Sequence, residues 1–385
     1  MADVAAFSFL TAFAVATLLT PLVARLARRV GAVDPLRDRG LARQATPLLG
    51  GIAILAGALV AALAFLPQTP ELRAVLVAAV LITGIGVIDD VRDLPPAVKL
   101  VGQIIAVAIP VAAGVRVETF TLPFLGRVEM GALGAPVTAL GLIAIVNVVN
   151  FSDGVDGLAA GVCAISAAAF AIIAFDLGET GAGVLAALTC GAALGFLVHN
   201  FHPASVFMGD AGSNLLGLLL GCIIVEGSLK TNALIALIGP LVVLAVPFLD
   251  TGFVLAKRLK YRRPVYMADA NHFHHRFARI GFSQRRTVAY LYGWTLAMAA
   301  AAVALRFVPY SDDHGNFNLG WSLVMGGLLT LALGASVYLV YVLEILKLRR
   351  FREREARRRD PAVTPEEIEE RVVRDLETGE FPALR

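Results

Sequence analysis

The sequence has few charged residues and few cysteines for its length. Only 16% of its 385 residues are Asp, Glu, Lys or Arg, and 58% are hydrophobic. Soluble domains average about 25% charged and about 45–50% apolar residues, so this composition excludes a soluble enzyme and a disordered chain. The 3 cysteines lie inside apolar runs, which excludes a disulfide-stapled secreted protein. The composition therefore predicts a polytopic membrane protein.

Long apolar runs define the predicted spans. A membrane-crossing helix needs about 20 mostly apolar residues. The sequence contains about eleven such segments, near residues 4–24, 48–66, 72–88, 98–114, 134–151, 157–175, 182–199, 213–226, 232–256, 287–308 and 319–346. The first has no basic region before it and is too long for a cleavable signal peptide, so we expect it to remain as an anchor. The expected fold class is an all-α polytopic membrane protein, and 213–226 is its shortest span.

Basic residues predict the orientation, because Lys and Arg collect in cytoplasmic loops. Three basic stretches lie at 25–43, 257–286 and 347–359. Eleven crossings with the N-terminus outside place all three in the cytoplasm, whereas ten crossings place two of them outside. We therefore expect a transmembrane domain over 1–346 and a basic, then acidic, cytoplasmic tail over 347–385. The segment 115–131 alternates weakly and predicts a small outer hairpin.

Four polar clusters fall on the predicted cytoplasmic side, although the topology is assigned without them. They are 89–93, 147–156, 199–210 and 272–275. A transporter more naturally places its ionisable groups near the bilayer midplane. This one-sided array instead predicts an active site that faces the cytosol.

Adjacent carboxylates at the edge of a bilayer cost free energy unless a positive charge compensates them. Asp89 and Asp90 directly follow an apolar run, so they indicate either a solvated loop start or a cation site. Lys99 is the only lysine in this loop. It is a candidate partner for the two carboxylates or for a phosphate.

The run Asn147-x-x-Asn150-x-x-Asp153-Gly154-x-Asp156-Gly157 carries four oxygen-bearing side chains within ten residues. The spacing of three places both asparagines on one face of a helix end. The glycines allow close backbone approach to a ligand. Such a run can bind a nucleotide or hold a hard cation. An Asx-rich turn is the simpler interpretation, but it does not explain all four side chains.

Two further motifs indicate binding of an anion. The first is the run Phe207-Met208-Gly209-Asp210-x-Gly212-Ser213, which precedes a predicted span. The free N–H groups at the N-terminus of that helix favour an anion. Asp210 either caps the helix or brings a metal to the anion. The run His272-x-His274-His275-Arg276 is better suited to phosphate oxygens than to zinc, because its adjacent histidines diverge and no cysteine is near. No Gly-x-x-x-x-Gly-Lys-Ser/Thr sequence is present, so the sequence shows no ATP-binding motif that could drive a pump.

Together with Thr46-Pro47 and Gly50-Gly51, these ordered motifs resemble the polyprenyl-phosphate N-acetylhexosamine-1-phosphate transferase family, of the MraY/WecA type (glycosyltransferase family 4). The resemblance covers roughly residues 40–285. Members of that family are membrane enzymes that join a sugar-1-phosphate from a UDP-sugar to a polyprenyl phosphate, release UMP and need Mg²⁺ or Mn²⁺. The His272 to Arg276 run looks more like the WecA-like branch, which uses UDP-N-acetylglucosamine. The muramyl-pentapeptide branch carries three consecutive histidines.

The resemblance implies roles for individual residues. Asp210 is implied as the metal ligand. The implied substrate-binding residues are Arg43, Lys99, Asn147, Asn150, Gly154, Val155, Phe207 and Arg276, with Phe207 stacking on uracil. The implied catalytic residues are Asp89, Asp90, Asp153, Asp156, His272, His274 and His275. Asp89 is expected to position the metal or lipid phosphate rather than to act as a base, because a phosphomonoester with a second pKa of about 6 is already mostly dianionic.

The implied reaction transfers GlcNAc-1-phosphate from a UDP-amino-sugar to undecaprenyl phosphate, as the first membrane step of a cell-envelope glycan pathway. It is expected in the inner membrane, with the active site on the cytoplasmic face. Alternatives are phospho-MurNAc-pentapeptide transfer and, in a different class, transport of an anionic lipid or nucleotide sugar. We expect no nucleic-acid partner. Gly50, Gly51 and Gly57 permit close helix packing within a subunit or in a homodimer.

Overall fold

The computed structural model describes residues 2–34, 46–122, 126–227, 242–249, 251–252, 283–308 and 318–338. In this part of the chain, 8 helices are long and apolar enough to cross a membrane, and two more are apolar but shorter. The protein is therefore an all-α polytopic membrane protein, as predicted. It divides into two compact units, of which the first comprises Met1–Ala268 with Val288–Pro309 and the second comprises Asp269–Thr287 with Tyr310–Arg385.

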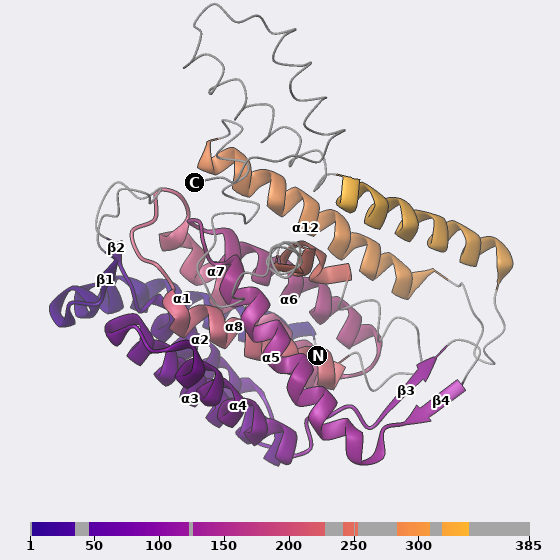
Figure 1. Cartoon of the computed structure of the whole chain (residues 1–385), viewed down its shortest axis with the longest axis horizontal. Helices are drawn as coiled ribbons and strands as arrows, with labels where there is room; N and C mark the ends of the chain where they lie inside the picture. The colour runs from indigo at the N-terminus through magenta and orange to yellow at the C-terminus, as the bar shows by residue number, and fades with distance from the viewer. Residues whose placement is uncertain are drawn as a thin grey trace, which may run out of the picture. The chain divides into compact units, whose positions relative to one another are not determined.

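The first unit holds nearly all the labelled elements of Figure 1. In chain order they are α1 (Ala2–Val30), β1 (Val33–Asp34), β2 (Thr46–Pro47), α2 (Gly50–Phe65), α3 (Pro70–Arg92), α4 (Pro96–Ala112), β3 (Thr119–Leu122), β4 (Gly126–Glu129), a short 3-10 turn (Gly131–Leu133), α5 (Gly134–Ser152), α6 (Leu158–Asp176), α7 (Thr180–Asn200), α8 (Gly209–Gly227) and α12 (Gln284–Phe307). The first residues of α12 belong to the second unit, which also contains a helix at Leu319–Tyr338.

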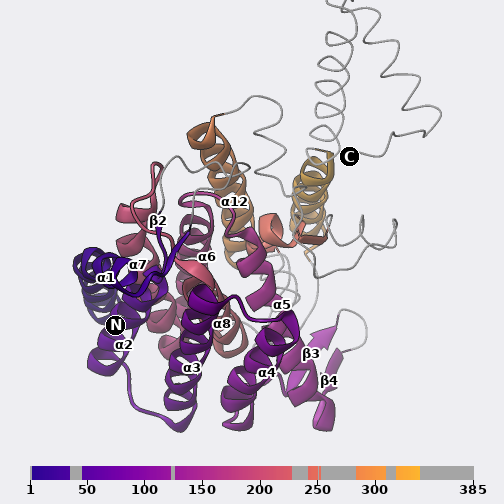
Figure 2. The ribbon, with the colours of Figure 1, turned by 60° about the vertical axis from the view of Figure 1, so that its left-hand side comes forward.

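Each predicted span except 232–256 coincides with one of these helices. Most of 232–256 lies outside the described residues, and so does the tail 347–385. The shortest predicted span, 213–226, is part of the 19-residue helix α8 and is confirmed as a helix. The predicted hairpin is also confirmed, because β3 pairs antiparallel with β4. Figure 2 shows this hairpin beyond the ends of α4 and α5.

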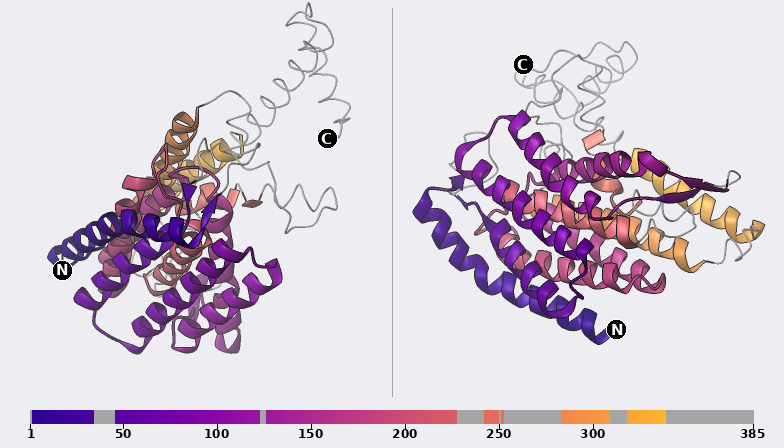
Figure 3. Two further views of the ribbon diagram at one scale, coloured as in Figure 1. Left: turned by 90° about the vertical axis from the view of Figure 1, so that its left-hand side faces the viewer. Right: turned by 90° about the horizontal axis from the view of Figure 1, so that it is seen from below.

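Among the candidate membrane helices that the structure describes in the first unit, α8 is the most enclosed. In its apolar window 83% of the residues are buried within the protein, compared with 28% for α1. Figure 3 shows α1, in indigo, running along one edge of these helices. Helices α2, α3, α5, α6 and α7 all contact α8. The apolar window of α8 is therefore packed mostly against other helices of the protein.

Short turns bring several helix ends to one end of the bundle. Helix α3 ends where Asp93 adopts a left-handed φ of 51°, and α4 begins with Pro96 at its first position, which suits a residue that lacks an N–H donor. The last turn of α3 therefore lies beside the first turn of α4. Helices α5 and α6 are likewise joined by the short segment 153–157. The β3–β4 hairpin joins α4 to α5 at the opposite end.

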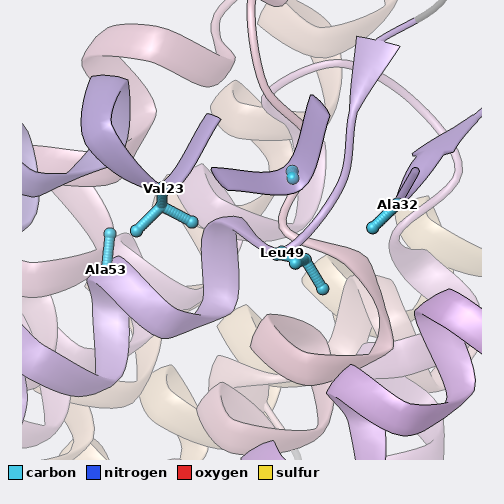
Figure 4. Packing of buried hydrophobic residues seen from close by; sticks show 5 residues of the cluster. Val23, Ala32, Leu49 and Ala53 are labelled. Carbon is cyan, nitrogen blue, oxygen red and sulfur yellow. The ribbon is translucent and has the colours of Figure 1, made fainter. Parts of the chain in front are cut away.

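The entry to α2 is fixed by a buried leucine. Leu49 is 2% exposed and packs with Val23, Ala27, Ala32 and Ala53, as Figure 4 shows. Its φ of 75° is uncommon for a residue with a side chain, and the surrounding packing sustains it. This turn directs the N–H groups of Gly50 and Gly51 to the carbonyls of Phe207 and Met208, at 2.9 and 3.0 Å.

Helices α3 and α8 approach closely at Gly86. A Cβ atom added at Gly86 would lie 2.6 Å from the carbonyl carbon of Asp210 and would also overlap the backbone of Ala211. Neither backbone can move away easily, because both helices are packed on other sides. The glycine thus allows the end of α3 to contact the start of α8.

We predict that Gly86→Ala lowers the thermal stability of the purified protein, because overpacking of this kind costs about 1–3 kcal/mol. Gly84→Ala in the same helix is the matched control, since a Cβ at Gly84 meets nothing within 4 Å. Unfolding in detergent, followed by fluorescence-detected size exclusion, measures both variants. Equal melting temperatures for the two would contradict the close approach.

Candidate active site

Four helix ends of the first unit meet and place polar side chains together. The last turn of α3 carries Asp89 and Asp90, and the first turn of α4 carries Lys99. The last turn of α5 carries Asn150, and the first turn of α8 carries Asp210. Hydrogen bonds and two ion pairs link these five residues, which span more than a hundred positions of the sequence.

Asp90 holds the start of α8. Its carboxylate accepts hydrogen bonds from the N–H groups of Asp210 at 2.8 Å and Ala211 at 3.2 Å. These N–H groups have no partner inside the helix, so a carboxylate from another helix acts as the cap and also suits the positive end of the helix dipole. Gly209 has a φ of 68°, and a Cβ there would lie 2.6 Å from Asp90 Cγ. Only glycine fits that position.

Lys99 joins two carboxylates. Its Nζ contacts Asp89 Oδ2 and lies 3.2 Å from Asp210 Oδ2. The other oxygen of Asp89 accepts a hydrogen bond of 2.7 Å from the N–H of Leu94. The side chain of Asp89 is only 5% exposed, whereas those of Lys99 and Asp210 are 31% and 29% exposed. Lys99 and Asp210 are therefore accessible to a ligand, while the buried carboxylate of Asp89 orients the ammonium of Lys99.

Asn150 fixes the second oxygen of Asp210. Its amide nitrogen donates to Asp210 Oδ1 at 3.0 Å and to Ser213 Oγ at 2.9 Å. The Ser213 hydroxyl in turn donates to the Gly209 carbonyl at 3.0 Å. The carboxylate of Asp210 thus lies between an amide on one oxygen and an ammonium on the other, in a set orientation.

The loop between α5 and α6 contributes two more carboxylates. Asp153 is half-buried, and its loss of hydration, together with the negative charges of Asp210 and Asp90, raises the pKa of Asp153 to about 8. Asp156 instead faces the segment after α7. Its Oδ2 lies 2.7 Å from His202 Nδ1 and accepts a hydrogen bond of 3.1 Å from the N–H of Ala204.

Asn200 ties this loop to the segment that carries Phe207. Its Oδ1 accepts from the N–H of Gly157 at 2.9 Å, and its amide nitrogen donates to the carbonyl of Val206, also at 2.9 Å. The hydroxyl of Tyr292 in α12 donates to the carbonyl of Gly157 at 2.5 Å. Both backbone polar groups of Gly157, its N–H and its carbonyl, are therefore held by side chains from other helices.

Three of the implied substrate-binding residues differ in exposure. Gly154 is exposed, Phe207 is half-buried and Val155 is buried. The N–H of Phe207 donates to the carbonyl of Pro47 at 2.9 Å. The backbone at Phe207 is therefore held by the Thr46-Pro47 segment, which belongs to an earlier motif of the same ordered series.

Some predicted site residues lie elsewhere or outside the described residues. The amide of Asn147 donates to Gln103 and to its own helix, rather than toward Asp210. The residues Arg43, His272, His274, His275 and Arg276 lie outside the described residues, so their roles stay predictions. No sequence motif assigns a role to Gln103, Asn200, His202 or Tyr292. For Gln103 the available signal is its spacing of four residues from Lys99, on the same helix face.

Comparison with known proteins identifies the family. A family profile described as "Glycosyl transferase family 4" matches residues 72–228. The chain is 33% identical over 301 residues to the probable undecaprenyl-phosphate N-acetylglucosaminyl 1-phosphate transferase of Bacillus subtilis, which covers 78% of this chain and 84% of that protein. The chain belongs to glycosyl transferase family 4.

Other family 4 relatives are of two kinds. The decaprenyl-phosphate N-acetylglucosaminephosphotransferase of Mycobacterium tuberculosis (strain ATCC 25618 / H37Rv) is 36% identical over 355 residues, covering 84% of this chain and 87% of that protein. The phospho-N-acetylmuramoyl-pentapeptide-transferase of Desulforudis audaxviator is 34% identical over 334 residues, covering 78% of this chain and 96% of that protein.

The donor chemistry of this family 4 site suits a hard divalent cation. Among the described residues, no three His, Cys, Asp or Glu side chains are grouped so as to hold a metal by themselves. Mg²⁺ commonly uses only one or two carboxylates and completes its shell with water and substrate phosphates. The half-exposed carboxylate of Asp210, with its oxygens already oriented, fits that pattern.

We predict that Asp90→Asn lowers thermal stability by about 1–2 kcal/mol, because an amide can accept only one of the two N–H groups and loses the charge that favours the helix end. Asp93→Asn removes the same charge from an exposed residue three positions later and serves as the control. Thermal unfolding of the two purified variants measures the difference. A melting temperature of Asp90→Asn equal to that of the control would refute the capping role.

Proposed function

We propose that this protein transfers N-acetylglucosamine-1-phosphate from UDP-N-acetylglucosamine to a polyprenyl phosphate, giving a polyprenyl-diphosphate-linked sugar and UMP. The observation that carries the proposal is the orientation of the Asp210 carboxylate by Asn150 and Lys99 at converging helix ends, in a chain that belongs to family 4. The names of its relatives from Bacillus subtilis and Mycobacterium tuberculosis supply the donor and acceptor classes.

The reaction needs positioning and charge neutralisation more than covalent catalysis by the protein. An oxygen of the lipid phosphate forms a bond to the β-phosphorus of the donor, and the bond from that phosphorus to the bridging oxygen breaks. UMP leaves with the bridging oxygen and its electron pair. The exposed part of Lys99 is placed to stabilise negative charge on the phosphates, and Asp89 keeps its ammonium in position.

A divalent cation, Mg²⁺ or Mn²⁺, fits the proposal as the cofactor. Asp210 would hold it together with the phosphate oxygens of the substrates. When bound, it supplies neutralisation of the charge that develops on the diphosphate. Asp90 takes no direct part in that step, because both of its oxygens accept hydrogen bonds from α8.

We place the site on the cytoplasmic face of the inner membrane. The last turns of α1 carry Arg25, Arg28 and Arg29, and the chain then continues through β1 and β2 to the end of the bundle where the site lies. Basic residues next to a span favour the cytoplasmic side.

The decisive experiment incubates the purified protein with labelled UDP-N-acetylglucosamine, undecaprenyl phosphate and Mg²⁺. We expect release of UMP and a labelled lipid product. Parallel reactions contain UDP-MurNAc-pentapeptide as the donor. Product from that donor alone would replace our assignment with pentapeptide-phosphate transfer, and movement of the intact nucleotide sugar into vesicles without product would favour a transporter.

We predict that Asp210→Asn reduces kcat at least 100-fold at ordinary Mg²⁺ concentrations and raises the Mg²⁺ concentration needed for half-maximal rate, because a neutral amide binds the cation more weakly. Glu129→Gln, at an exposed position of strand β4, removes one negative charge at the opposite end of the bundle and is the control. Steady-state rates across a Mg²⁺ titration measure both. An unchanged metal requirement in Asp210→Asn would reject Asp210 as the ligand.

A further inference from the structure

A second polar layer lies beneath the site. Gln103 follows Lys99 by four residues on α4, Asn214 follows Asp210 by four on α8, and Asn147 precedes Asn150 by three on α5. One helical turn rises about 5.4 Å, so each amide lies on the same helix face as a site residue and one turn further into the bundle. Each of the three helices thus contributes one site residue and one amide.

The three amides hydrogen-bond to one another across the helices. The Asn147 amide nitrogen donates to Gln103 Oε1 at 2.8 Å, and the Gln103 amide nitrogen donates to Asn214 Oδ1 at 3.3 Å. Gln103 and Asn214 are each 5% exposed. We call Gln103, Asn147 and Asn214 the amide triad. Gln103 is its centre, because it alone contacts both of the others.

From this geometry we propose that the amide triad is a positioning element for the transfer reaction, with Gln103 as its key residue. It sets the relative position of α4, α5 and α8, and therefore the distances from Lys99 and Asn150 to the two oxygens of Asp210. This inference rests on the proposed function and deepens it. Asn147, expected from the motif to bind substrate, is here assigned to support Asn150 instead.

The physical reason lies in the surroundings of the triad. Gln103 and Asn214 are buried and Asn147 is half-buried, so hydrogen bonds between these amides restrict the allowed positions of the helices that carry them. Further along, the α5–α8 contact includes the apolar packing of Gly217 against Val146, beyond the hydrogen bonds that Asn150 donates to Asp210 and Ser213. Apolar packing permits small shifts and rotations more readily than directional hydrogen bonds do. A shift of about 1 Å at a catalytic group is enough to slow a reaction about 100-fold.

The test replaces Gln103 with methionine, which has a similar length but cannot hydrogen-bond through an amide. We expect Gln103→Met to reduce kcat about 10-fold or more, to raise the Mg²⁺ concentration for half-maximal rate, and to leave the KM for the UDP-sugar within twofold. Thr189→Val is the matched control, because Thr189 is fully buried and bonds only to the Leu185 carbonyl of its own helix. It should keep the wild-type kcat.

A double-mutant cycle tests whether the residues act together. Asn214→Leu should reduce kcat, and the double variant Gln103→Met/Asn214→Leu should lose no more than Gln103→Met alone, since the first change already breaks the shared bond. Additive losses would show independent roles and overturn the proposal. So would a kcat of Gln103→Met within twofold of wild type, or an equal loss in Thr189→Val.

Hydrogen–deuterium exchange supplies a readout that does not depend on the reaction. Peptides that cover 209–215 should exchange faster in Gln103→Met than in the wild type, and at the wild-type rate in Thr189→Val. Unchanged exchange in Gln103→Met overturns the positioning role. If the wild type itself makes no lipid-linked sugar from any donor, the proposed function fails, while the exchange data still decide whether the triad positions α8.

Discussion

The carboxylate of Asp90 accepts hydrogen bonds from two N–H groups in the first turn of α8, and the rest of the site depends on this contact. It joins the end of one apolar helix to the start of α8, whose apolar window is 83% buried within the protein. A glycine at Gly86 lets the two backbones approach, and a glycine at Gly209 gives the carboxylate room. Because α8 is fixed there, Asp210 stands at a defined place among the ends of α3, α4 and α5.

Charge and burial divide the carboxylates among different tasks. Asp90 serves the α8 backbone, and Asp89 holds Lys99 from a buried position. Asp156 engages His202 and the backbone of Ala204, so it shapes the loop after α5. Asp210 remains accessible, with one oxygen facing an amide and the other an ammonium. Carboxylates that appear equivalent in the motifs therefore have distinct partners, and Asp210 is the one best presented to a cation and a phosphate.

Much of the fold and part of the site were predictable from the sequence. The apolar runs located the helices, including α8, whose short apolar run counted as a span because the distribution of basic residues required an odd number of crossings. The order of the Asp, Asn and Gly motifs indicated family 4, and the topology predicted from the spans and basic residues placed Asp89, Asn150 and Asp210 on one side of the membrane. Gln103 escaped detection, because a single glutamine in an apolar helix matches no motif and acquires meaning only from its neighbours on α5 and α8.

The sequence by itself determined which segments are helices and which chemical groups gather at their ends, because hydropathy and residue type are local properties. Only the tertiary structure decided which oxygen faces which donor. It assigned Asp90 to the α8 backbone, directed Asn147 away from Asp210, and paired Asp156 with His202. These choices follow from helix approach and rotation about the helix axes, which depend on packing between residues far apart in the chain and leave no trace in the spacing of any one motif.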